Sequence, residues 1–266
     1  MAHRRITAIP SVPGVTGALA ALVVALWLAS APALAQQQPP PQGAGYVSNL
    51  SGPLFAVKSD GSRRVLSTQS QVSSGDTLIT EDKTYARVRF SDTSEVTLRP
   101  GTQFQIENYS FDRAAPEKDN SAFRLFKGAL RTVTGLIGRR GSQDAYRLNT
   151  ATATIGIRGT VFGVTVCLPG TCGTMAPGTY VNVIDGRVAI APPVLPGVTL
   201  PPVVLSAGQF GYVPPVGPAV QLPGDPGIGG PLGVTFKSPD APAPGSQAPG
   251  TPPPPKPPAS DCIVRF

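Results

Sequence analysis

Thr154-Ile155-Gly156-Ile157-Arg158-Gly159-Thr160-Val161-Phe162-Gly163-Val164 is the stretch of this 266-residue chain that decides its fold class. β-branched and apolar residues alternate along it, which predicts a half-buried β-strand. Glycines inside such a strand are typical of a bulge or of close approach by another backbone. Arg158 needs a carbonyl or carboxylate partner there, unless its side chain faces water.

Short strands and turn signals continue on both sides of this stretch. Residues 59–62 and 73–76 predict turns, residues 85–90 alternate with a period of two, and residues 185–187 (Asp-Gly-Arg) predict another turn. No long stretch shows a period of 3.6 residues. We therefore expect an all-β fold: a single elongated domain of short strands, either solenoid-like or sandwich-like, with the recurring glycines favouring the solenoid.

The first 35 residues have the layout of a secretory signal peptide. Basic residues precede an apolar, uncharged run over residues 19–31, and Ala33-Leu34-Ala35 matches an A-x-A cleavage site before Gln36. The alternative is an uncleaved membrane anchor, but the run is shorter than the ~20 residues of a spanning helix. We predict cleavage, a periplasmic or otherwise exported chain, and no stable membrane span afterwards.

Composition divides the remainder into three regions. Residues 36–44 form a Gln/Pro-rich linker, residues 45–213 a β domain, and residues 214–266 a Pro/Gly-rich tail. The two proline-rich flanks cannot bury enough apolar surface to offset the entropy lost on ordering, so we expect both to be disordered.

The cysteines and the single histidine limit the kinds of site that the chain can form. Cys167 and Cys172 enclose four residues, and in an oxidising compartment such a pair predicts a local disulfide at a hairpin tip. Cys262 is left either free or paired between molecules. His3 would leave with the signal peptide, so we expect no metal site and no cofactor.

Charge and motif content argue against two classes of function. The formal charge is +7, but lysines and arginines are scattered rather than gathered in a basic stripe with aromatic residues, so we expect no nucleic-acid partner. The sequence has no nucleophile elbow or P-loop, and Asp76, Asp92 and Asp185 lie in turn signals, where aspartate commonly bonds local backbone. We therefore predict a non-catalytic protein without catalytic residues.

The order of several short elements resembles a FecR-type domain. Residues 75–80 resemble its early G-D-x-I-x-T element, and residues 86–98 its following hairpin, with Thr93 in place of a glycine. Residues 150–164 resemble its T-P-x-A-x-x-G-V-R-G-T-x-F-x-V signature, with Ala151 in place of the proline; residues 181–188 and 205–209 resemble its closing elements. The residues that carry the resemblance are Gly75, Asp76, Gly156, Arg158, Gly159, Thr160, Phe162, Asp185, Gly186 and Gly208, and we expect them to be mainly structural.

The resemblance also implies a function. The best-known FecR proteins are membrane-spanning regulators of iron-uptake signalling with a cytoplasmic anti-sigma segment, whereas only 18 residues precede the apolar run here. We therefore expect a stand-alone exported module that senses, signals or binds in the cell envelope, its partner an unknown envelope protein or small ligand. One alternative is a structural scaffold anchored through the proline-rich tail, and a second is an iron-uptake-type transmembrane regulator.

Arg158 has two possible roles. Its guanidinium could grip an anionic group of a partner, or it could clamp backbone carbonyls or a turn carboxylate such as Asp76 or Asp92. We expect the structural clamp, because a signature shared across diverse partners suits folding better than specificity.

Overall fold

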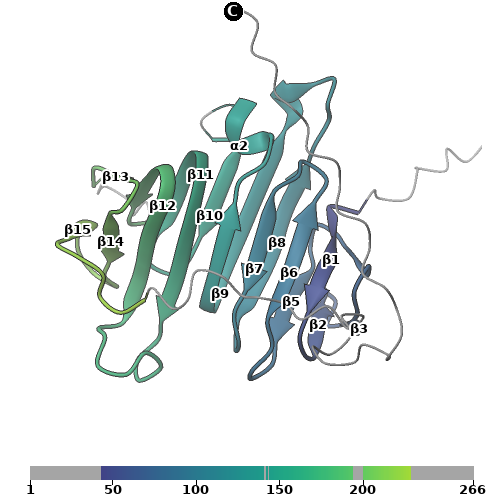
Figure 1. Cartoon of the computed structure of the whole chain (residues 1–266), viewed down its shortest axis with the longest axis horizontal. Coiled ribbons are helices and arrows are strands. Elements are labelled where there is room, and N and C mark those ends of the chain that lie inside the picture. The colour runs from purple at the N-terminus through teal and green to yellow at the C-terminus, as the bar shows by residue number, and fades with distance from the viewer. Residues whose placement is uncertain (1–42, 141, 143, 194–199, 229–266) are drawn as a thin grey trace, which may run out of the picture. The chain divides into compact units, whose positions relative to one another are not determined.

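A computed structural model of the chain describes residues 43–140, 142, 144–193 and 200–228 (Figure 1). Strands dominate this part of the chain, which confirms the all-β expectation. The early elements are β1 (Gly45–Leu50), β2 (Leu54–Val57), β3 (Arg63–Leu66), β4 (Gln71–Val72), β5 (Thr77–Thr80), β6 (Ala86–Phe90), β7 (Glu95–Leu98), β8 (Gln103–Ser110) and the 3₁₀ turn η1 (Pro116–Lys118). The later elements are β9 (Asn120–Val133), the one-turn helix α2 (Ile137–Arg140), β10 (Tyr146–Asn149), β11 (Thr154–Cys167), β12 (Gly178–Ala191), β13 (Val203–Ser206), β14 (Phe210–Val213) and β15 (Val220–Leu222).

All described strands belong to one hydrogen-bonded sheet, which folds over itself into two layers. The first layer has the order β4-β1-β6-β7-β9-β11-β12-β14-β15. The second has the order β3-β2-β5-β8-β9-β10-β11-β12-β13. Its β9–β10 pair is parallel, so the sheet is mixed. The fold thus has the two layers of a sandwich, one of the two forms expected from the sequence, and strands that pass from one layer into the other connect them.

Three long strands, β9, β11 and β12, belong to both layers because each of them bends. In β11 the register shifts between Arg158 and Val161, so of the two structures expected for the glycines of this strand, a bulge or a close backbone approach, a bulge is present here. In β12 the bend comes at Gly186, whose φ is +80°. The turn predicted at residues 185–187 is therefore wrong: β12 runs through these residues from one layer into the next. An Asp-Gly pair suits either a hairpin turn or a bulge, and only the pairing of β12 along β11 decides between them.

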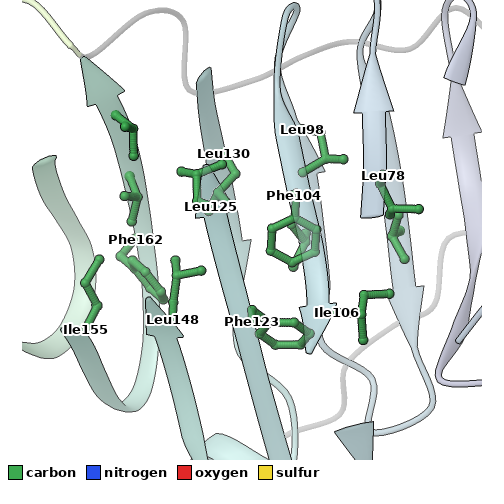
Figure 2. Close-up of a cluster of buried hydrophobic side chains, with 14 of the residues drawn as sticks. Leu78, Leu98, Phe104, Ile106, Phe123, Leu125, Leu130, Leu148, Ile155 and Phe162 are labelled. Atoms are coloured by element: carbon green, nitrogen blue, oxygen red, sulfur yellow. The ribbon is translucent and has the colours of Figure 1, made fainter. Parts of the chain in front are cut away.

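The apolar core lies between the two layers, where aromatic side chains meet. Phe90 of β6, in the first layer, has its ring centroid 5.2 Å from that of Phe123, which β9 contributes from the second layer. Tyr146 of β10 and Phe162 of β11 meet in the same way, with centroids 6.3 Å apart. Figure 2 shows Phe104, Phe123 and Phe162 among the leucine and isoleucine side chains of this core. Burial of these rings holds the two layers together.

A second, smaller apolar cluster forms around the hairpin between β11 and β12. The predicted Cys167–Cys172 disulfide is present there. Two stacked tyrosines belong to the same cluster and hold the segment after the disulfide loop: Tyr180 Oη donates to the carbonyl of Ala176 at 2.9 Å, and Tyr212 Oη to that of Pro177 at 2.7 Å. Ile228 is buried in the same cluster. With β15, this residue carries the folded domain past residue 213, where we expected the tail to begin.

Several expectations fall on residues outside the described part of the chain. They are the signal peptide with Ala33, Ala35 and Gln36, the linker up to residue 42, Cys262, and the tail from residue 229. No helix in the described ranges is long and apolar enough to cross a membrane.

The disulfide should stabilise the domain by closing its small loop. Replacing both Cys167 and Cys172 with serine should lower the free energy of unfolding by about 2 kcal/mol, the loop-entropy expectation for so short a loop. Urea titration of the oxidised protein and of the double variant measures this difference. If reducing agent lowers the stability of the native protein but leaves the double variant unchanged, the effect belongs to the disulfide; equal stability of the two proteins would contradict the prediction.

Candidate binding site

The residues that carry the FecR resemblance lie in several separate parts of the fold. Phe162 is in the core, and Gly75 and Gly208 occupy turns with positive φ. The bends of β11 and β12 bring Gly159, Thr160 and Gly186 together: a Cβ atom on Gly186 would lie 2.5 Å from the carbonyl oxygen of Gly159. The signature stretch is therefore mainly the element that turns two strands from one layer into the other.

Asp76 is a fully buried carboxylate that ties three segments together. Its Oδ1 accepts from Lys58 Nζ at 3.0 Å, and its Oδ2 accepts from Arg64 Nη2 at 2.5 Å and from the Ser73 amide at 2.9 Å. The two cations are only partly buried. Asp76 thus joins the turn before β5 to β3 and to the connection between β2 and β3.

Asp92 is a buried carboxylate held by uncharged donors. Its Oδ1 accepts from the Ser94 amide at 3.0 Å, from Ser94 Oγ at 2.6 Å and from Tyr109 Oη at 3.1 Å, and its Oδ2 accepts from the Ile137 amide at 3.2 Å. The Leu136 amide also donates to the Asp92 carbonyl. Asp92 therefore anchors the start of α2 to the β6–β7 turn, and α2 carries Arg139.

Two tyrosines close to Asp92 are affected by its charge. Burial raises the pKa of Tyr109, and the negative charge of Asp92 adds to this effect. Burial between the two layers likewise raises the pKa of Tyr146, again with a contribution from Asp92. Both phenols therefore stay neutral in the folded domain at pH values where tyrosines in an unfolded chain ionise.

This difference should make the domain less stable in alkali. Above about pH 10 the unfolded chain loses phenolic protons that the folded chain keeps, so the free energy of unfolding falls as pH rises. Below about pH 10 both states keep these protons, and the contribution of the two tyrosines to stability is fully present. The slope from fully buried Tyr146 should be about 1.4 kcal/mol per pH unit. Urea titrations between pH 9 and pH 11 should show a shallower slope for Tyr146→Phe than for the native protein; equal slopes would contradict the prediction.

Arg158 does not form the clamp that we expected from the sequence. Its side chain is exposed and makes no hydrogen bond or ion pair with another described residue. The carboxylates of Asp76 and Asp92 are buried and already bonded to other groups. The physical reason is strand alternation: Ile157 points into the core, so Arg158 points outward. The Arg158 side chain is therefore exposed and bonds to none of the described carboxylates.

Arg158 belongs to an outward-facing surface of the second layer, which we call the arginine face. It consists of the outward residues of β10, of β11 before its bend and of β12 after its bend: Arg147, Asn149, Thr154, Gly156, Arg158, Arg187, Ala189 and Ala191. Their neighbours in each strand are core residues. The arginine face itself carries three arginines and no acid, and at its β10 edge Asn149 Nδ2 donates to Glu107 Oε2 at 3.4 Å.

The arginines of this face are close to one another in the sheet. Arg158 and Arg187 are paired directly across β11 and β12, and Arg147 pairs with Gly156 two residues before Arg158. At the border of the face, Arg139 Cγ would lie 3.6 Å from a Cβ atom on Gly159. None of the four guanidinium groups bonds to another described residue. Like charges directly opposite in a sheet are destabilising, so folding alone gives no reason for this arrangement.

Arginine side chains in this arrangement can bind an anion. A guanidinium presents planar pairs of N–H donors that match carboxylate and phosphate oxygens, and several held on rigid strands are already positioned for a ligand. Among the described residues, no three of His, Cys, Asp and Glu lie together as a metal site would need. The surface therefore has the chemistry of a binding site for negative charge.

Sequence reasoning singled out Arg158 but not Arg147 or Arg187. Strand alternation alone could place each of them on a solvent-facing side. It could not show that the three share one face, because that depends on β10, β11 and β12 being neighbours in the same layer.

Comparison with known proteins places this domain in a family. Residues 76–189 match the model of the FecR protein family. These residues include the whole arginine face except Ala191, together with the bends of β11 and β12. Residues 76–189 of the chain are therefore a FecR-type domain.

Two crystal structures, at 1.65 and 2.50 Å resolution, of a candidate anti-sigma factor from Parabacteroides distasonis are similar to part of the chain. In each case the identity is 15%, the TM-score is 0.41, and the match covers 56% of this chain and 60% of the other. The match thus spans less than two thirds of that protein's length. No curated protein matches the chain.

Proposed function

We propose that this protein is an exported, non-catalytic FecR module that senses or signals in the cell envelope by binding an anionic group of a partner on its arginine face. The observation that carries the proposal is the exposed Arg158–Arg187 pair. The two arginines are directly opposite each other across β11 and β12, and neither bonds to a described acid, an arrangement that opposes folding and becomes favourable when an anion is bound.

Export is supported by the Cys167–Cys172 disulfide. Disulfides persist in oxidising compartments such as the bacterial periplasm and are rare in the cytosol. The layout of residues 1–35 as a signal peptide points in the same direction. Cell fractionation with antibody detection tests the location: the protein should be recovered in the periplasmic or extracellular fraction and lack residues 1–35.

The way in which the arginine face is held supports binding rather than catalysis. β10, β11 and β12 are hydrogen-bonded neighbours, and Asp92 fixes α2 beside the bend. A surface on regular strands gives precise positions to its side chains. The face offers donors for an anion but no histidine, carboxylate or cysteine that could act as a base or nucleophile.

Removing the charges should leave the fold intact. In the Arg158→Gln/Arg187→Gln variant, the thermal midpoint should stay the same or rise slightly, because a like-charge contact is worth only about 0.2–1 kcal/mol. Thermal unfolding followed by circular dichroism measures the change. A clear fall in the midpoint would show that these arginines support the fold, and would remove the observation on which the proposal depends.

Binding is tested by photocrosslinking in the native host. A photoreactive amino acid replaces Ser206, which pairs with Arg187 at the edge of the arginine face, and in a control it replaces exposed Lys127 of β9. The Ser206 position should give a defined adduct that the Lys127 position does not. The adduct should disappear in the Arg158→Gln/Arg187→Gln background. An adduct that persists without the two arginines would refute the proposed function.

The same adduct separates the module from a scaffold anchored by its tail. A variant that ends at residue 228 keeps β15 and Ile228 but lacks the proline-rich tail. Retention of the adduct in this variant supports binding by the β domain. Loss of the adduct would favour the scaffold.

A further inference from the structure

We infer that the ligand of the arginine face is an extended, carboxylate-rich segment of a partner protein, whose main chain lies over Gly156. This inference rests on the proposed function and specifies the chemistry of the partner. Two features of the face carry it: the glycine itself and the spread of the arginines.

Gly156 has no structural reason to be a glycine. Its φ is not in the positive region, and β11 keeps regular pairing there with Arg147 on one side and Ala189 on the other. A Cβ atom on Gly156 would have no neighbour within 4 Å. Glycine costs roughly 0.5–1 kcal/mol relative to alanine within a strand. A glycine in open space inside a strand marks a place where a ligand or another backbone comes close.

The residues around Gly156 leave a low surface bordered by guanidinium groups. Gly156 and Ala189 pair across β11 and β12, and Arg147 pairs with Ala122 of β9 on its other side. The small side chains let a main chain approach the sheet. Arg147 lies beside this low surface, and Arg158 and Arg187 lie two residues along it.

The spacing of the arginines favours several carboxylates over one compact anion. Strands lie about 4.8 Å apart and alternate residues about 6.7 Å apart, so the backbones of Arg147 and Arg187 are separated by roughly 10–12 Å. One phosphate group cannot contact side chains that stay spread over this span. An extended peptide places alternate side chains about 6.7 Å apart, so its acidic residues can meet Arg147 and the Arg158–Arg187 pair separately.

Binding of labelled synthetic peptides to the full-length protein, measured by fluorescence anisotropy, tests the inference. The probe is a dodecapeptide of alternating Asp and Ser, and the control peptide has Asn in place of Asp. The acidic peptide should bind and the neutral one should not, and added salt should weaken the binding because exposed charges are screened. Equal binding of the two peptides would overturn the inference.

Two pairs of variants assign the binding to this face. Arg147→Gln/Arg158→Gln/Arg187→Gln should weaken binding about tenfold or more, whereas Lys83→Gln/Lys118→Gln/Lys127→Gln, with the same net charge, should change it little. Gly156→Leu should weaken binding without any change of charge. Its control, Thr165→Leu, places the same side chain beyond the bend of β11, in the first layer, and should have no effect. If each variant behaves like its control, the peptide binds elsewhere and the inference fails.

Vesicles of phosphatidylglycerol and inorganic phosphate are the competing probes. Arginine-dependent binding of either one, with none of the acidic peptide, would replace the peptide by a phosphate ligand. If the acidic peptide fails while the Ser206 adduct with a protein still needs Arg158 and Arg187, the inference is wrong and the proposed function stands. If the adduct is also independent of the arginines, the proposed function fails too.

Discussion

Replacing Asp92 with alanine should lower the free energy of unfolding by about 3–5 kcal/mol, among the largest effects of any single substitution in this domain. The change leaves the amides of Ser94 and Ile137 and the hydroxyl of Tyr109 without their acceptor. A buried donor that loses its acceptor costs roughly 1–3 kcal/mol. Urea unfolding followed by circular dichroism measures the loss.

The matched controls for this prediction are Asp60→Ala and Asp92→Asn. Asp60 also accepts a hydrogen bond from the amide two residues along, that of Ser62, but its surroundings are exposed. Its replacement should change stability little. Asp92→Asn keeps one acceptor oxygen and should cost less than alanine. If Asp92→Ala were no more harmful than Asp60→Ala, the Asp92 hydrogen bonds would not hold the domain together.

Replacing Asp92 should also make α2 less stably attached to the sheet. The Ile137 amide donates to the Asp92 carboxylate, whereas the Leu136 amide donates to its main-chain carbonyl, so the segment that carries Arg139 loses one of its two hydrogen bonds to the β6–β7 turn. Hydrogen exchange of residues 136–140 should become faster in Asp92→Asn, even under conditions where the variant remains folded. Unchanged exchange there would show that α2 is held by other contacts.

Replacing Gly186 with alanine should cost about 2–5 kcal/mol, for two separate reasons. The φ of +80° places the residue in the left-handed region, which costs roughly 1–2 kcal/mol for an L residue with a side chain. The new Cβ would also lie 2.5 Å from the Gly159 carbonyl oxygen and 2.7 Å from Thr160 Cγ2. Relieving such a contact must move one strand, which typically costs a further 1–3 kcal/mol or so.

Two other glycines separate these contributions. Gly208 has nearly the same φ, +81°, but its Cβ would have no neighbour within 4 Å, so Gly208→Ala should show the conformational cost alone. Gly156 has neither constraint, and Gly156→Ala should leave stability unchanged or slightly higher. Chemical denaturation of the three variants should therefore rank Gly186 as the most sensitive. Equal losses at Gly186 and Gly208 would mean that the bends of β11 and β12 do not touch as described.

The local features of the fold were predictable from the sequence because each depends on residues close together in the chain. Alternation predicted strands such as β6 and β11, and the glycines of β11 indicated either a bulge or a close backbone approach, of which the bulge is found near Gly159. The short gap between Cys167 and Cys172 predicted their disulfide. Apolar residues must point away from water, and glycine alone accepts positive φ at little cost, so these patterns have few alternative structures.

The candidate site was only partly predictable. Arg158 was recognised as unusual, but the expected clamp to a carboxylate was wrong, because Asp76 and Asp92 are bonded to groups from other strands. The turn expected at residues 185–187 was wrong for a similar reason, since the neighbouring β11 turns Asp185-Gly186-Arg187 into a bend. In both cases a short motif had two possible structures, and a partner distant in sequence selected one.

The sequence by itself determined the all-β class, the positions of most strands and turns, the disulfide and the resemblance to FecR proteins. Only the tertiary structure decided how the sheet folds into two layers and which arginines share a surface. The physical reason is that a strand's alternation selects which side chains are buried but not which strand lies beside it. Arg147, Arg158 and Arg187 become one site only through the pairing of β10 with β11 and of β11 with β12.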